Sequence, residues 1–211
     1  MGGLFSRHAK RVEHAHLGLI EMLSDYHRSG AYARDLEQVG QLALDYLQHL
    51  TLASEKSALV LDIDETSLMN KWPDLVDPEN GYDKDAWEEW IQSARAPAIS
   101  STLELFNAAK KKGIDIFFIS GRHPDEIAAT ITNLHRAGYG DWKELIGEPV
   151  HATQPDLLVF PEAASFKTAA RWSIVQRGYD IVLSMGDQQS DIEGGFAEKT
   201  FKLPNPFYTI I

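Results

Sequence analysis

Three carboxylates stand within four positions of the chain, at Asp62, Asp64 and Glu65. They follow the apolar run 59–61, which is typical of a short strand buried on both faces of a sheet. Carboxylates crowded at the end of a buried strand repel one another, so the pattern favours a cation or a reacting group that offsets their charge. Such groups bind metal ions, attack electrophiles and transfer protons.

Two other interpretations of the same residues were open. A solvated strand end followed by a helix, with Asp64 or Thr66 as the N-cap, would need no chemistry. A calcium loop would use Asp62, Asp64 and Thr66 as its first, third and fifth positions. It fails further along, because Ser67 stands where the loop needs glycine and Pro73 where it needs the bidentate glutamate.

Polar residues also follow other apolar runs. Ser120 and Gly121 come after the run 114–119, and Asp187 and Asp191 come after the run 181–185. Further short strands are predicted at 157–160 and 201–203, and Lys167 lies in the helix predicted between 157–160 and 181–185. Each residue alone has an ordinary explanation, such as a turn hydroxyl, a surface lysine or a helix cap. Their common position, after strands or at a helix start, is what singles them out.

Strands that alternate with helices indicate an α/β fold with a doubly wound parallel sheet. Helices are predicted at 101–113, with Ser101 and Glu104 as a capping box, at 124–138, with Pro124 in the first turn, and at 167–177, with Ser165 as the cap. In such sheets, ligands bind outside the carboxyl ends of the strands. The polar residues are therefore expected to converge on one crevice.

The remaining segments define a predicted organisation. Residues 1–211 are expected to form one domain, with an N-terminal helical extension over about 1–54 and an insert over about 68–99 that forms a small helical cap. The extension is predicted from an apolar face that recurs at three and four residue steps, ending at Leu50. The insert contains Trp72, Tyr82, Trp87 and Trp90.

Composition excludes several classes of function. The chain has 31 acidic and 20 basic residues, a formal charge of -11 and no Lys/Arg cluster long enough to make a basic stripe, which disfavours binding to a nucleic acid polymer. It has no cysteine, so thiolate chemistry and disulfides are excluded. No stretch is apolar over the roughly 18 residues that a membrane span needs. A phosphate-bearing ligand would need a local cation or helix N-terminus to bind so anionic a protein.

At this point the sequence resembles the haloacid dehalogenase (HAD) superfamily of phosphotransferases. The run from Asp62 to Thr66 is similar to the first motif, Ser120 to the second, Lys167 to the third, and Gly186-Asp187 with Asp191 to the fourth. Residues 62–67, 186–191 and 201–206 resemble the acid phosphatase branch, subfamily IIIB, which includes bacterial class B/C-type enzymes and plant vegetative storage proteins. Plant members commonly have tryptophan where this chain has Gln189.

The resemblance implies a HAD-like Rossmannoid core and a Mg²⁺-dependent acid phosphatase that acts on small phosphate monoesters. Asp62 would be the nucleophile, forming an aspartyl-phosphate, and Asp64 the general acid and then base. Mg²⁺ would be bound by the Asp62 and Asp187 carboxylates and the Asp64 carbonyl oxygen, with Asp191 holding a bound water or Lys167. Ser120, Gly121 and Lys167 would bind the phosphoryl oxygens, with Arg122 as an added contact or a helix cap. Glu65 is expected to be structural.

Substrate selection is assigned to the insert, where Trp72, Tyr82 and Trp87 are possible contacts for the leaving group, because aromatic faces stack on nucleobases and aryl groups. Broad specificity that includes nucleoside monophosphates is expected. The alternative is a non-catalytic storage or phosphate-ligand-binding protein of the same fold. Export with a removed leader is favoured over a cytoplasmic location, as in relatives, and a homo-oligomer is left open.

Overall fold

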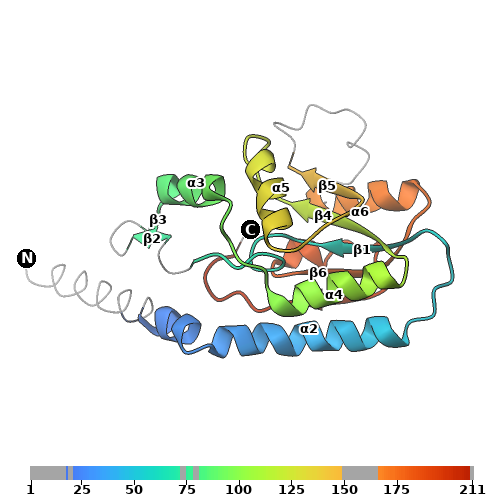
Figure 1. Cartoon of the computed structure of the whole chain (residues 1–211), viewed down its shortest axis with the longest axis horizontal. Coiled ribbons are helices and arrows are strands. Elements are labelled where there is room, and N and C mark those ends of the chain that lie inside the picture. Colours follow the sequence, from blue (N-terminus) through green and yellow to red (C-terminus); the bar gives the residue numbers. More distant parts are fainter. Residues whose placement is uncertain (1–17, 19–20, 72–74, 78–80, 149–165, 210–211) are drawn as a thin grey trace, which may run out of the picture.

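The computed structural model describes residues 18, 21–71, 75–77, 81–148 and 166–209. Its centre is a five-stranded parallel sheet with the strand order β5-β4-β1-β6-β7 (Figure 1). The strands are β1 Ser57–Leu61, β4 Asp115–Ser120, β5 Glu144–Gly147, β6 Asp180–Gly186 and β7 Thr200–Lys202. The predicted α/β fold with a parallel sheet is confirmed.

Helices cover both faces of the sheet. Alternate residues of β1 point to opposite faces, so Leu59 and Leu61 join one buried cluster while Ala58 and Val60 join another. On the first side, α4 Ser100–Lys111 packs on the sheet, and α2 Ala31–His49 packs on α4 (Figure 1). On the second side lies α6 Phe166–Gln176. Burial on both faces explains why these strands are continuous apolar runs rather than alternating ones.

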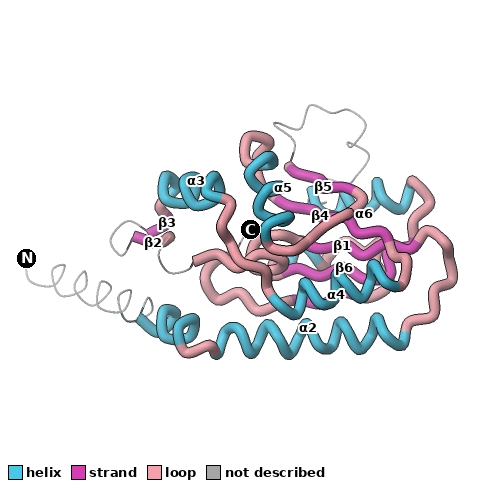
Figure 2. Tube along the Cα trace, viewed as in Figure 1, coloured by secondary structure: helices cyan, strands magenta, loops and turns pink. Residues whose placement is uncertain are grey.

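Between β1 and α4 the chain forms a small separate group. It contains the antiparallel pair β2 Val76–Asp77 and β3 Gly81–Tyr82, followed by α3 Lys84–Ser93. The Asp83 side chain begins α3 by accepting a hydrogen bond from the Ala86 N–H at 3.0 Å. Figure 2 shows α3 to the left of the sheet. The Asn133 amide, on α5 Ile127–Arg136, bonds both the N–H and the carbonyl of Ala96, which fastens the returning chain to the core.

Several predicted boundaries were wrong. Ser101 does not cap α4, because the helix already begins at Ser100, and its hydroxyl donates to the Leu36 carbonyl instead. Pro124 lies in a turn, and α5 begins only at Ile127. The strand β5 was not predicted. The predicted strand 157–160 and the Ser165 cap lie outside the described residues.

The structure contains two helices in the region of the predicted N-terminal extension. Residues 21–28 and α2 are helical, and a turn at Ser29 and Gly30 separates them. No helix in the described part of the chain is long and apolar enough to cross a membrane. The division into one domain with a cap at 68–99 stays a prediction.

Candidate active site

The carboxyl ends of three adjacent strands bring the predicted residues together. β1 lies between β4 and β6, and the chain leaves β1 for β4 on one side and later returns to β6 on the other. Such a reversal of strand order opens a crevice at the carboxyl ends. Asp62 follows β1, Ser120 ends β4 and Asp187 follows β6, so all three lie at this edge.

Lys167 joins two of the aspartates. Its ammonium donates hydrogen bonds to Oδ1 of Asp62 and Oδ1 of Asp191, both at 2.6 Å. The three side chains are almost fully buried. Burial alone would lower the pKa of Lys167, but the two carboxylates outweigh it and the net pKa lies above its ordinary value. Lys167 is therefore a permanent cation in the site, placed there by the first turn of α6.

Asp62, Asp187 and Asp191 form a carboxylate cluster in which each residue offers an oxygen within 4.8 Å of the others. All three are buried, and Lys167 offsets only one of their charges. Oxygen ligands from carboxylates are what hard divalent cations such as Mg²⁺ bind, and an uncompensated buried charge is costly. The donor set, its burial and its excess negative charge therefore fit a divalent cation.

The raised pKa values of Asp62 and Asp187 also favour a cation between these carboxylates. Burial raises the pKa of Asp62 well above its ordinary value; the Lys167 charge opposes this, and the charges of Asp191, Asp187 and Asp64 add to it. Asp187 also has a raised pKa, mainly from burial, although it accepts a hydrogen bond from Asn205 at 2.7 Å and another from Gln188. A cation bound between the carboxylates would favour their ionised forms.

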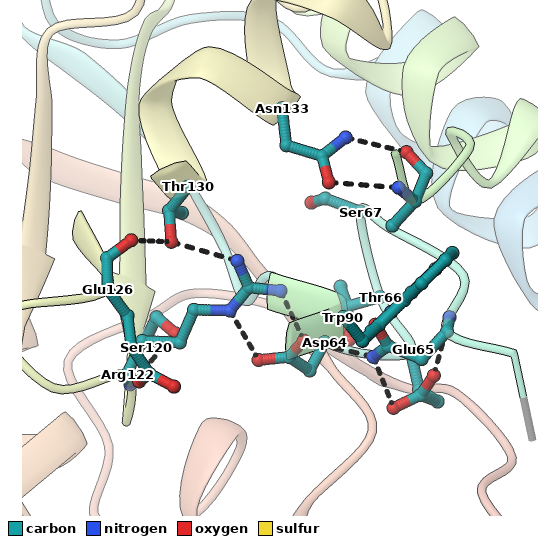
Figure 3. Close-up of polar contacts among 12 residues, drawn as sticks. Asp64, Glu65, Thr66, Ser67, Trp90, Ser120, Arg122, Glu126, Thr130 and Asn133 are labelled. Atoms are coloured by element: carbon teal, nitrogen blue, oxygen red, sulfur yellow. Dashed lines mark hydrogen bonds and ion pairs between the residues drawn. The ribbon is translucent and has the colours of Figure 1, made fainter. Parts of the chain in front are cut away.

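The Asp64 carboxylate lies in a different environment, drawn in Figure 3. Arg122 donates to its two oxygens at 2.7 and 3.0 Å, and Asn70 Nδ2 donates to Oδ1 at 3.0 Å. Burial raises the pKa of Asp64, but the charge and hydrogen bonds of Arg122 and the Asn70 hydrogen bond outweigh it, so the net pKa lies below its ordinary value. Asp64 is not a member of the carboxylate cluster in the described structure.

Two of the predicted phosphate-binding residues, Ser120 and Gly121, lie at the carboxyl end of β4, the strand next to β1. Ser120 is buried, and its hydroxyl accepts a hydrogen bond from the Arg122 N–H at 3.2 Å. Gly121 is exposed and lines a cavity of about 620 Å³ together with Asp62, Asp64, Lys167 and Asp187. The cavity thus opens onto both the candidate nucleophile and the candidate acid.

The outer wall of this cavity comes from α3 and from the C-terminal tail. Lys84, Trp87 and Glu88 of α3 and Phe207 and Tyr208 of the tail line it. Trp87, one of the predicted leaving-group contacts, therefore lines the same cavity as Asp62 and Asp64. Trp72 falls outside the described residues, and the side chain of Tyr82 in β3 is not among those described.

Sequence reasoning missed part of the site. Arg122 was considered as a helix cap or phosphate contact, whereas it is buried and paired with Asp64. No role was predicted for Asn70 or for the tail residues Asn205 and Tyr208. Arg122 directly follows the polar end of a buried strand, and Asn205 lies in residues 201–206, which resemble the acid phosphatase branch, so these two carried a signal; Tyr208 carried none.

Glu65 lies outside the carboxylate cluster, fully buried on the other side of Asp64. Its oxygens accept hydrogen bonds from the Asn70 N–H at 2.9 Å, from Asn70 Nδ2 at 3.0 Å and from the Tyr208 hydroxyl at 2.8 Å. Its backbone has φ 51, a left-handed conformation that few residues other than glycine adopt. Burial and the Asp64 charge raise the pKa of Glu65 to about 8, against the effect of the Asn70 hydrogen bond.

Known proteins resemble this chain over most of its length. The sequence pattern of the HAD superfamily, subfamily IIIB (acid phosphatase), matches residues 7–211. The stem 28 kDa glycoprotein of Glycine max is 37% identical over 90% of this chain and 74% of its own length, and acid phosphatase 1 of Solanum lycopersicum is 30% identical over the same shares. Vegetative storage protein 1 of Arabidopsis thaliana is 29% identical over 86% of this chain and 66% of its own length.

A solved structure shows the same fold. The class C acid phosphatase of Bacillus anthracis superposes with a TM-score of 0.70 at 26% identity, covering 93% of this chain and 86% of that one. The same enzyme has been solved with tungstate bound. By sequence pattern, relatives and fold, the chain belongs to subfamily IIIB of the HAD superfamily, the acid phosphatases.

Proposed function

We propose that this protein is a Mg²⁺-dependent acid phosphatase that hydrolyses phosphate monoesters through a phosphorylated Asp62. The carrying observation is the buried arrangement in which Asp62 lies in a carboxylate cluster, contacts Lys167 at 2.6 Å and faces the same cavity as Asp64. A carboxylate nucleophile can approach a phosphate only when the repulsion between the two anions is reduced. The family membership supports the reaction class.

The metal would be held by the carboxylates of Asp62 and Asp187 and by the backbone carbonyl oxygen of Asp64. When bound, Mg²⁺ supplies positive charge that offsets the phosphate and the carboxylates together. Asp191 holds Lys167 by a hydrogen bond, so it keeps the ammonium beside Asp62. Asp187 is in turn oriented by Asn205 and Thr66, whose side chains donate to it at 2.7 and 3.3 Å.

The reaction then needs two displacements at phosphorus. In the first, an oxygen of Asp62 forms a bond to phosphorus while the ester oxygen leaves with its bonding electrons and takes a proton from Asp64. The pair with Arg122 favours the ionised form of Asp64, so Asp64 must bind a proton before this step, which an acidic pH promotes. In the second, a water molecule gives a proton to Asp64 as its oxygen bonds to phosphorus, and the bond between phosphorus and the Asp62 oxygen breaks with its electrons returning to the Asp62 carboxylate. The products are an alcohol and inorganic phosphate, and both aspartates return to their starting states.

Binding of the phosphoryl group is assigned to Ser120, Gly121 and Lys167. In phosphoryl transfer, charge is spread over the three equatorial oxygens, and hydrogen-bond donors aimed at them stabilise the transition state. Lys167 supplies an ammonium within reach of the Asp62 oxygen that attacks. Ser120 and Gly121 supply donors at the end of β4, directly across from β1.

The leaving group is assigned to the part of the cavity that α3 lines. The cavity of about 620 Å³ is large enough for a small organic group. Trp87 offers it an aromatic face, and the charged or polar side chains of Lys84, Glu88 and His123 line the same cavity. We expect broad specificity that includes nucleoside monophosphates and aryl phosphates, because an aromatic face stacks on nucleobases and aryl groups.

The test is hydrolysis of 4-nitrophenyl phosphate by the intact protein with Mg²⁺, with chelator, and with Asp62→Asn. We expect activity only with Mg²⁺ and an intact Asp62, and a mass increase of one phosphoryl group on wild-type protein quenched during turnover. Asp45→Asn, an exposed aspartate of α2, is the matched control and should keep full activity. Activity that survives both chelation and Asp62→Asn would refute the mechanism.

A storage or phosphate-ligand-binding role is the second candidate, because vegetative storage proteins are among the relatives. It predicts binding of phosphate or tungstate without turnover of any monoester. The intact Asp62 and its contact with Lys167 favour catalysis. Calorimetric titration of the metal-loaded protein with tungstate, beside the hydrolysis assay, separates the two functions.

A further inference from the structure

One buried amide connects the candidate acid of the reaction to the helix that covers the leaving-group space. Asn70 Nδ2 donates to Oδ1 of Asp64 and to Oε2 of Glu65, both at 3.0 Å, and Asn70 Oδ1 accepts from the Trp90 indole N–H at 2.8 Å. Asn70 is 1% exposed, so water does not compete for these bonds. Figure 3 shows Trp90 beside Asp64 and Glu65.

The orientation of this amide follows from its partners. An indole N–H only donates, and the Asp64 carboxylate, which its pair with Arg122 keeps ionised, only accepts. The oxygen of Asn70 must therefore face Trp90, and its nitrogen must face Asp64. The Asn70 N–H also donates to Glu65 at 2.9 Å, so backbone and side chain are held by the same buried group. Both amide hydrogens and the amide oxygen are engaged, which leaves the side chain a single orientation.

Two donors hold the Asp64 carboxylate from different sides. Arg122 approaches from the end of β4, and Asn70 approaches from the segment that leads to α3. An Arg fork alone can follow a carboxylate that rotates, whereas a second donor from another side restricts the rotation. A carboxyl group that must reach the ester oxygen gains from such restriction, because a displacement of about 1 Å can lower a rate by about 100-fold.

Trp90 and Trp87 lie one turn apart on α3, and Trp87 lines the cavity while Trp90 holds Asn70. The helix whose Trp87 lines the cavity is thus also the helix whose Trp90 orients the Asn70 amide. Lys71 Nζ lies 5.0 Å from the centre of the Trp90 ring and covers it from the chain that follows Asn70. Asn70 and α3 thus connect Asp64 to the cavity wall directly.

We propose that Asn70, held by the Trp90 indole, is a positioning residue that aims the Asp64 carboxyl at the ester oxygen of the leaving group and makes this aim depend on α3. The inference rests on the proposed function, because it assigns Asp64 the proton transfer to the leaving group. It predicts that Asn70 and Trp90 matter most when the leaving group needs a proton.

The experiment compares two substrates in the intact, Mg²⁺-loaded protein. Glycerol 2-phosphate has an alkoxide leaving group that requires protonation, whereas 4-nitrophenolate leaves without it. For Asn70→Ala we expect kcat/KM to fall about 10- to 100-fold with glycerol 2-phosphate and less than about threefold with 4-nitrophenyl phosphate. Trp90→Phe, which keeps a ring and removes the N–H, should show the same preference to a smaller extent.

Controls separate this effect from damage to the fold and from failure of the proposed function. Trp142→Phe makes the same replacement at a tryptophan that packs against Phe118 and His135, and both substrates should retain their rates. If Asn70→Ala does not fold, Trp90→Phe decides. Equal losses for the two substrates would overturn the inference while leaving the phosphatase intact; wild-type protein that hydrolyses neither substrate would overturn the proposed function and the inference with it.

Discussion

The guanidinium of Arg122 donates two hydrogen bonds to the carboxylate of Asp64, at 2.7 and 3.0 Å, although the two residues are 58 positions apart in the sequence. Arg122 also donates to the Thr130 hydroxyl at 2.8 Å, so the fork is anchored on α5. The Arg122 side chain is 2% exposed and that of Asp64 is 16% exposed. The pair therefore belongs to the folded core as well as to the site, and its effect on stability can be measured apart from activity.

Removing the cation of this pair should destabilise the fold. Arg122→Met leaves a buried carboxylate without its partner, and we expect a loss of about 3 to 5 kcal/mol in the free energy of unfolding, measured with urea. Asp64→Asn in the same background should recover part of that loss, because it removes the unpaired charge. Arg177→Met, which breaks an ion pair whose side chains are 43% and 42% exposed, is the control and should cost less than about 1 kcal/mol. Strictly additive losses for Arg122 and Asp64 would contradict the coupling.

The stability of the metal-free protein should fall as the pH rises. The pKa of Glu65 is raised from 4.5 to about 8, mainly by burial, and burial also raises the pKa values of Asp62 and Asp187. A carboxyl group with a raised pKa in the folded state binds its proton more tightly there. Its contribution is complete below its unfolded pKa and is lost as the pH rises through the folded value. Asp64, whose pKa is lowered, contributes in the opposite sense, but only below its ordinary value.

Thermal unfolding in chelator should therefore give a Tm that decreases between about pH 5 and pH 9. Glu65→Gln keeps the side-chain volume and removes the titrating group, so its Tm should decrease less over this range. Glu37→Gln, an exposed glutamate of α2, should behave like the wild type. A Glu65→Gln profile as steep as that of the wild type would show that Glu65 does not carry the effect.

Magnesium should stabilise the folded protein through the carboxylate cluster. A ligand that binds only the folded state adds about 2.7 kcal/mol at a concentration 100 times its Kd. We expect Mg²⁺ to raise the Tm of the wild type and of Asp45→Asn, and to leave Asp187→Asn unchanged, because Asp187 supplies one of the three converging carboxylates. An equal rise in Asp187→Asn would place the metal elsewhere.

The local pattern of the sequence was enough to predict the inner strands and the residues at their carboxyl ends. β1, β4 and β6 are buried on both faces and therefore form apolar runs that are visible without a structure. β5 is a half-buried edge strand whose only large apolar residues are Leu145 and Ile146. So short a signal does not distinguish a strand from a loop.

The contacts that complete the site depend on tertiary packing. The Tyr208 hydroxyl meets Glu65 across 143 residues, and Asn205 meets Asp187 across 18. Asn205 lies in residues 201–206, which resemble the acid phosphatases, but neither tail residue belongs to a periodic segment, so the local pattern does not indicate which side chain it contacts. Asn70 falls in an irregular segment as well, and its role became visible only with Trp90 placed beside it.

The close approach of Gly186 to Asp191 gives the last prediction. A Cβ atom on Gly186 would lie 2.3 Å from the Asp191 Cβ and 2.2 Å from its Cγ, so Gly186→Ala must displace the Asp191 side chain. Asp191 holds Lys167 at 2.6 Å, and the ammonium would lose its position beside Asp62. We expect kcat to fall about 100-fold, with a loss of about 1 to 3 kcal/mol in stability from overpacking. Gly140→Ala, where a Cβ would meet nothing within 4 Å, is the control and should change neither. Wild-type kcat in Gly186→Ala would show that the contact between Asp191 and Lys167 is dispensable for the reaction.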